Sequence, residues 1–217
     1  MRPGLACLLP CAAAALAFAP AFANGLDFDR TFTAGVEPRQ SHYVATYRLG
    51  NTEHRVEVWR DRDLHLKRRT DDRIEIHVTK PAGEVEWTMV VLDLKRKIAT
   101  RVERTNLLRI GHFTDWFALS HSLSRPAGAY ELGPIARDAP RLKPVASCRW
   151  HLLTQGGRAS KICWSAAHHL PLVIADGSDQ VQWKIVEVDS RPLPAGAFAI
   201  DDRDFVRNNA DQDIQAD

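Results

Sequence analysis

The sequence predicts a mainly β fold: one strongly curved antiparallel sheet, a half-open barrel, with one or two short helices covering its concave face. Three observations predict it. Residues 41–103 alternate apolar and polar side chains with a period of two, interrupted by turn signals. Residues 107–123 change to helical spacing, and the alternation returns at residue 145. Roughly nine or ten strands in one sheet must close on themselves or cover the concave face.

The chain begins with the features of a secretory signal peptide. Arg2 precedes an apolar run over residues 5–18, and residues 21–23 form a small-x-small cleavage site. We expect a signal peptide over residues 1–23 with cleavage near Ala23, and a periplasmic or secreted mature protein. No later apolar run reaches about 18 residues, so we expect no transmembrane segment in the mature chain.

The mature chain is expected to form one β domain over residues 24–205, followed by a polar, flexible tail over residues 206–217. The whole chain has a formal charge of +2, and this count includes Arg2. Because Arg2 is removed with the signal peptide, the mature chain is expected to be nearly neutral. This balance gives no support to nucleic acid as a partner. The basic runs at 67–69 and 95–97 fall at expected hairpin turns, where solvated charges are common.

The first hairpin can be predicted residue by residue. A two-residue turn at Gly50 and Asn51 gives one mainly apolar face and one face of complementary charges. The predicted cross-strand pairs are Tyr43–Val58, Ala45–Val56 and Tyr47–His54 on the apolar face, with Arg48–Glu53 and Val44–Glu57 on the other.

Further strands follow in order. A second hairpin joins residues 64–66 to 74–78, a longer strand covers 85–91, and a turn leads into 98–102.

The helical stretch comes next, and Gly111 divides it into two short helices. Thr114 is the expected N-cap of a helix over 115–123. Four prolines make residues 125–144 an irregular connection across the fold.

The last strands begin at Val145. A hairpin over residues 148–164 is followed by two strands joined by a turn at Gly177 and Ser178. The proline-containing segment 191–198 is expected to be an irregular edge.

Cys148 and Cys163 are the two cysteines outside the signal peptide, and in an exported protein they predict a disulfide. A four-residue turn over 154–157 would place Leu153 opposite Arg158 and the two cysteines opposite each other. Fourteen intervening residues do not suit thioredoxin-like redox chemistry, which needs two residues between the cysteines. A zinc site would need two further ligands.

The histidines offer one metal candidate. His65 and His77 share the polar face of the second hairpin, where a one-residue change of register would pair them with each other or with Glu75 and Asp63. Otherwise we expect no cofactor. We find no Gly-x-Ser-x-Gly, His-Glu-x-x-His or phosphate-binding motif, so a metal-dependent or hydrolytic enzyme would need a site assembled from distant residues.

The predicted strands and helix carry more aromatic and sulfur-containing side chains than one covering helix would bury. Each residue alone is expected to belong to the core, but together they can line an apolar ligand pocket. The pocket residues are Tyr43, Tyr47, Trp87, Met89, Phe113, Trp116, Phe117 and Trp183.

The order of elements resembles the lipoprotein-carrier superfamily of the bacterial envelope, which includes the LolA and LolB carriers and the regulator RseB. The resemblance is carried by the signal peptide, the tyrosine-containing first strand, residues 85–103, and above all residues 148–194. It implies a half-open barrel with helices in its mouth and a cavity that accepts acyl chains or similar apolar ligands. We therefore expect a non-catalytic protein that binds a lipid, an acyl chain or another apolar molecule. The alternative is an envelope protein-interaction or sensing module that uses the hairpin edges and the tail.

Overall fold

The computed structural model describes residues 25–33, 35–62, 64–103, 115–135 and 139–209. The predicted signal peptide, the predicted helix cap Thr114 and the last residues of the predicted tail lie outside these ranges. Within them, no helix is long and apolar enough to cross a lipid bilayer.

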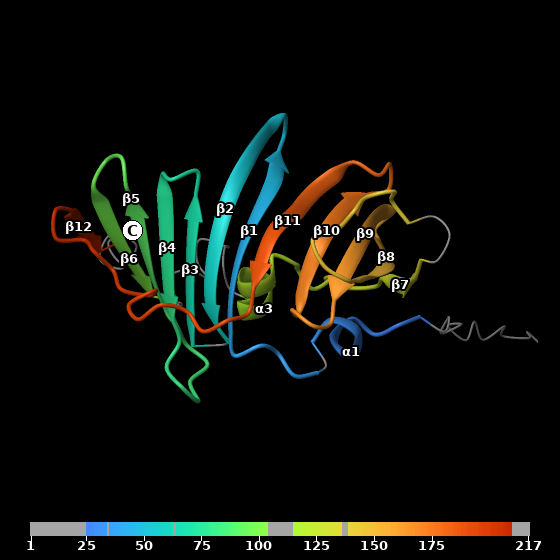
Figure 1. Cartoon of the computed structure of the whole chain (residues 1–217), viewed down its shortest axis with the longest axis horizontal. Coiled ribbons are helices and arrows are strands. Elements are labelled where there is room, and N and C mark those ends of the chain that lie inside the picture. Colours follow the sequence, from blue (N-terminus) through green and yellow to red (C-terminus); the bar gives the residue numbers. More distant parts are fainter. Residues whose placement is uncertain (1–24, 34, 63, 104–114, 136–138, 210–217) are drawn as a thin grey trace, which may run out of the picture.

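Twelve strands form one curved, open sheet, in agreement with the predicted fold class (Figure 1). Their order across the sheet is β12-β6-β5-β4-β3-β2-β1-β11-β10-β9-β8-β7. The strands are β1 (Gln40–Leu49), β2 (Thr52–Asp61), β3 (His65–Thr70), β4 (Ile74–Thr79), β5 (Thr88–Asp93), β6 (Ile98–Glu103), β7 (Glu131–Pro134), β8 (Arg149–Gln155), β9 (Arg158–Ser165), β10 (Leu170–Asp176), β11 (Val181–Asp189) and β12 (Val206–Asn209).

The predicted register of the first hairpin is confirmed at every pair. Tyr43 lies opposite Val58 and Tyr47 opposite His54, with Gly50 at a positive φ of 60° in the turn. The short turn and the alternation of apolar and polar residues together determine this register. A slip by one residue would turn the apolar side chains to the opposite face. The other edge of β1 pairs with β11, so β1 joins the N-terminal and C-terminal halves of the sheet.

Two short helices cover the same face of the sheet, which we call the inner face. It carries Tyr43 on β1, Val58 on β2, Leu66 on β3 and the apolar side chains in register with them. Helix α3 (Trp116–His121) lies behind β1 and β11 in Figure 1, and helix α1 (Phe28–Phe32), which we did not predict, lies near β9 and β10.

Helix α3 is shorter than the predicted helix over 115–123. Asp115 is its N-cap, since the carboxylate accepts a hydrogen bond of 2.9 Å from the Phe117 N–H. The helix ends at Ser122, which has a left-handed φ of 54°.

The C-terminal segment corrects two predictions. Residues 191–198 were expected at an edge, but the segment from 190 to 205 crosses the outer face, the side of the sheet away from the helices (Figure 1). There the Phe198 ring stacks on His65 with centroids 5.2 Å apart. The first residues of the predicted tail, 206–209, form β12, which pairs in parallel with β6. Residues 210–217 lie outside the described ranges.

The predicted disulfide between Cys148 and Cys163 is present, with Cα atoms 5.4 Å apart. The predicted register around it was wrong. Gly156 and Gly157 form a two-residue turn at positive φ, so Gln155 rather than Leu153 lies opposite Arg158. Cys163 is therefore opposite Trp150, and Cys148, just before β8, reaches it diagonally.

Most of the buried apolar residues form two clusters on the inner face. The larger lies between the central strands and Leu119 of α3, and the smaller packs α1 and Phe117 against β8 and β9. The larger cluster contains Tyr43, Ala45, Val56, Val58, Leu66, Val78, Trp87, Met89, Val102, Leu119, Leu170, Leu172, Trp183 and Ile185. Burial of this much apolar surface is the main stabilising contribution to the fold.

Candidate functional site

The structure gathers most of the predicted pocket residues at one place on the inner face. Tyr43, Trp87, Met89 and Trp183 belong to the larger cluster, and the half-buried Tyr47 and Trp116 pack against it. Phe117 belongs to the neighbouring cluster, and Phe113 lies outside the described residues.

Ring contacts connect these side chains. Trp87 meets Trp116 of α3 edge to face at 5.6 Å between centroids, and Trp183 contacts both Tyr43 and Tyr47 at 6.3 and 6.4 Å. Aromatic pairs in these geometries stabilise packing beyond the area they bury. These contacts form two groups, Trp87 with Trp116 and Trp183 with Tyr43 and Tyr47, and both belong to or pack against the larger cluster. We call these rings together the aromatic surface.

A buried polar cluster lies at the edge of this aromatic surface. Arg60 on β2 points to the inner face and is 0% exposed. Its Nη1 donates to Glu37 Oε1 at 2.7 Å and lies 2.8 Å from His121 Nε2, while Nε donates to the Ser41 hydroxyl at 3.3 Å. Arg60 therefore connects three parts of the chain: the sheet, the loop before β1, and the C-terminal end of α3.

His121 is held from both sides of its ring. Nδ1 lies 2.8 Å from the Ser120 hydroxyl and 3.1 Å from the Phe117 carbonyl, and the ring stacks on Phe117. Burial lowers the pKa of His121, and the charge of Arg60 lowers it further, although the hydrogen bond with Glu37 opposes this. Nε2 also lies 2.9 Å from Glu37 Oε1, and the hydrogen bond to this ionised carboxylate needs a proton on Nε2, because a carboxylate can only accept.

Glu37 is the only carboxylate among the described residues that pairs with Arg60. Burial opposes its ionisation, but the hydrogen bond with His121 and the charge of Arg60 outweigh burial and lower the pKa of Glu37. The Glu37 side chain is 29% exposed, so solvent reaches one side of this ion pair.

Two buried polar atoms beside this cluster have no hydrogen-bond partner: Arg60 Nη2 and the Tyr43 hydroxyl. Tyr43 and Arg60 are diagonal neighbours on the inner face of β1 and β2. Burial raises the pKa of Tyr43, against the positive charges of Arg60 and Arg68 and the nearby Ser122 hydroxyl. Leaving such groups unpaired costs stability, about 1–3 kcal/mol each, so their presence needs a reason.

Ser120, His121 and Glu37 are connected in the order of a serine–histidine–acid triad. The Ser120 hydroxyl, however, donates to the Trp116 carbonyl at 2.8 Å and is 1% exposed. A nucleophilic serine needs its proton on the base and an open approach to the substrate. The arrangement therefore suits the attachment of α3 to the sheet rather than attack on a substrate.

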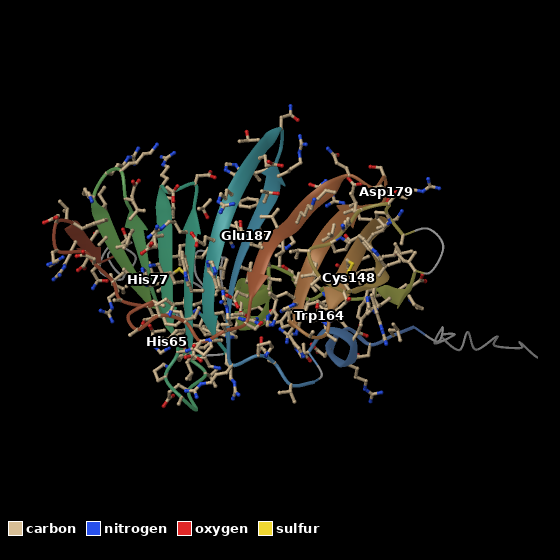
Figure 2. All side chains as sticks on the ribbon, in the orientation of Figure 1. His65, His77, Cys148, Trp164, Asp179 and Glu187 are labelled. Atoms are coloured by element: carbon tan, nitrogen blue, oxygen red, sulfur yellow. A yellow bond between two sulfur atoms is a disulfide. The ribbon has the colours of Figure 1, made fainter. Side chains whose placement is uncertain are left out.

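The predicted metal candidate is not assembled. Lys67, not His65, lies opposite His77, and His65 lies lower on the sheet, facing Thr79 (Figure 2). Nor does any group of three or more metal-ligating side chains occur among the described residues, which leave out Asp63.

His77 instead bonds to Glu75 at 2.6 Å, and Arg69 donates to the same carboxylate. Burial opposes the ionisation of Glu75, but the hydrogen bonds from His77 and Arg69 and the charge of Lys67 lower its pKa to about 2. This group is an ion-pair network on the outer face.

Comparisons with known proteins do not assign a family. No family model and no curated protein matches the chain. A solved structure described as PNGF-II in space group P21 aligns with 81% of this chain and 32% of its own, at 8% identity and a TM-score of 0.38. The chain thus spans about a third of that protein, and so low a similarity supports no argument about function.

The polar cluster was not predicted from the sequence, although one signal points to it. Arg60 follows Val56 and Val58 at the period-two spacing of the apolar face, where a charged residue is out of place. Its partners Glu37 and His121 are distant in sequence, so no local pattern could identify them.

Proposed function

We propose that this protein is an exported, non-catalytic binding protein that holds an apolar ligand, such as a lipid or an acyl chain, against the inner face beneath α3. The observation that carries the proposal is the aromatic surface on the inner face, which is covered by a helix of only six residues. Ligand sites of this class are mainly apolar and aromatic, with a few polar groups that orient the ligand.

The attachment of α3 supports the same proposal. On the sheet side the helix contributes Leu119 and Trp116 to the larger cluster, and its C-terminal end is held through Arg60 and Glu37. A helix of only six residues can move at less cost than a strand of the sheet, because a strand also pairs along its length with its neighbours. An apolar ligand would then replace the contacts that α3 makes with the inner face.

The proposal agrees with the implication of the resemblance to the lipoprotein-carrier superfamily, in which helices lie in the mouth of a half-open barrel. It also agrees with the predicted signal peptide and with the disulfide, which is typical of oxidising, exported compartments.

Titration of the detergent-free protein with the neutral fluorescent probe 1-N-phenylnaphthylamine tests this function. We expect saturable binding that Trp116→Ala weakens about three- to tenfold, the range expected for loss of one aromatic contact. Trp59→Ala is the matched control, since Trp59 is a half-buried tryptophan on the outer face beside His42 and Lys67. Absence of saturable binding, or equal effects of the two variants, would refute the proposed site.

A second candidate function is an envelope protein-interaction module. It is favoured by β12, a fully exposed strand at the edge of the sheet, which is where a partner strand adds to a sheet. Deletion of residues 206–217 separates the two functions: loss of captured envelope proteins with unchanged probe binding would favour the interaction module.

A further inference from the structure

The two unpartnered polar atoms on the inner face converge on the same end of α3. Arg60 contacts His121, the last residue of the helix, and the Tyr43 hydroxyl lies beside Ser122, the residue that follows. Both side chains are 0% exposed and both come from neighbouring strands of the same face. An N–H and an O–H group therefore lie in one buried region where neither makes a hydrogen bond of normal geometry, although the Ser122 hydroxyl lies near that of Tyr43.

The other atoms of Arg60 are fully used. Its Nε donates to Ser41 and its Nη1 is directed to Glu37 and His121, which leaves Nη2 with two N–H donors available. The Tyr43 hydroxyl supplies a third donor. An oxygen atom that accepts from both residues would satisfy groups that otherwise remain costly to bury.

The charges around Tyr43 favour an anion over a neutral acceptor. Arg60 and Arg68 both act on the Tyr43 hydroxyl. Glu37 compensates Arg60, whereas Arg68, which lies over the Tyr47 ring, forms no ion pair with any acidic side chain in the described ranges. With His121 neutral, two arginines face one carboxylate, so the region has an excess of one positive charge.

We infer that the ligand of the inner face carries an anionic oxygen head group, in its simplest form a carboxylate, which accepts hydrogen bonds from Arg60 Nη2 and the Tyr43 hydroxyl beside the C-terminal end of α3. This inference rests on the proposed apolar-ligand function and specifies the ligand as an amphiphile with an acidic head. Its tail would lie along the aromatic surface formed by Trp87, Trp116 and Trp183.

Displacement of 1-N-phenylnaphthylamine at pH 8 tests the inference, with hexadecanoate and hexadecan-1-ol as competitors of equal chain length. We expect the full exported chain, purified without detergent, to bind hexadecanoate about tenfold more tightly than the alcohol, as expected for a hydrogen bond to a charged group. Tyr43→Phe should remove about tenfold of the hexadecanoate affinity and leave the affinity for the neutral probe unchanged.

Two further variants complete the test. Arg68→Gln should also reduce the preference for hexadecanoate, since it removes the uncompensated charge. Arg101→Gln is the control, because it removes an exposed arginine from the outer face of β6, and it should change neither affinity more than about twofold. Tyr43→Phe should change the free energy of unfolding little, because the lost hydroxyl makes no hydrogen bond of normal geometry in the protein.

The outcomes separate the two proposals. Equal affinities for the acid and the alcohol, or an unchanged hexadecanoate affinity in Tyr43→Phe, would overturn the anionic head group while the neutral probe still binds. Failure of the neutral probe itself to bind the wild-type protein would refute the apolar-ligand function and, with it, this inference.

Discussion

Arg60 on β2 and His121 on α3 lie within hydrogen-bond distance, 2.8 Å between Nη1 and Nε2, although 61 residues separate them in the sequence. This contact and the ion pair with Glu37 attach the covering helix to the middle of the sheet. The strength of this attachment determines how readily the inner face can be uncovered, and it can be measured by substitution.

Glu37→Gln should destabilise the protein by about 3 kcal/mol, because it leaves Arg60 charged, buried and unpaired. Urea-induced unfolding at pH 7 measures this change. Glu57→Gln is the control, since Glu57 pairs with His42 at the surface, where such pairs contribute about 0–1 kcal/mol. Equal effects of the two substitutions would show that the Arg60 cluster adds no more stability than a surface pair.

The free energy of unfolding should decrease as the pH falls below about 6.5, because His121 resists protonation in the folded protein. Burial lowers its folded-state pKa, so the unfolded chain binds the proton first, and the stabilisation present above pH 6.5 is lost as the pH falls through the folded pKa. His121→Gln should reduce this dependence. Part of the pH dependence should remain in this variant, because burial also lowers the pKa values of His151 and His169.

Glu75→Gln should destabilise the protein by about 2 kcal/mol at pH 7 and have little effect at pH 2. The folded-state pKa of Glu75 is lowered from 4.5 to about 2, so its stabilisation is complete above pH 4.5 and is lost as the pH falls through 2. Unfolding curves of both proteins at several pH values would show the difference disappearing in this interval. A difference that does not depend on pH would mean that Gln destabilises the fold for steric reasons and not through loss of the negative charge.

Replacement of Cys148 and Cys163 by serine should lower the free energy of unfolding by about 3 kcal/mol, the value expected for opening a loop of this length. Thermal unfolding of the variant and of the oxidised wild type provides the comparison. The reduced wild type should unfold like the variant, and a wild type that is insensitive to reduction would contradict a structural disulfide.

The sequence predicted the elements that depend on local patterns. The first hairpin was predicted at every pair because the turn at Gly50 and Asn51 and the period-two alternation require the same register. The register of β8 and β9 was wrong, since a turn made only by Gly156 and Gly157 and a four-residue turn are both compatible with the sequence. The disulfide was predicted nevertheless, because both registers bring the cysteines within reach.

The sequence patterns did not predict the contacts between segments that are distant in the chain. β12 is polar and fully exposed, so nothing in residues 206–209 distinguishes a strand from a flexible tail until β6 supplies its backbone partners. The same holds for the polar cluster, which exists only when the fold brings Glu37, Arg60 and His121 together.

The central claim is that an apolar molecule binds the inner face beneath α3, and native mass spectrometry of the protein exported and purified without detergent tests it most directly. We expect a mass above that of the chain alone, an apolar species in the solvent extract, and loss of this species when hexadecanoate is added in excess. A protein that carries the mass of the chain alone and gains none on incubation with hexadecanoate would contradict it.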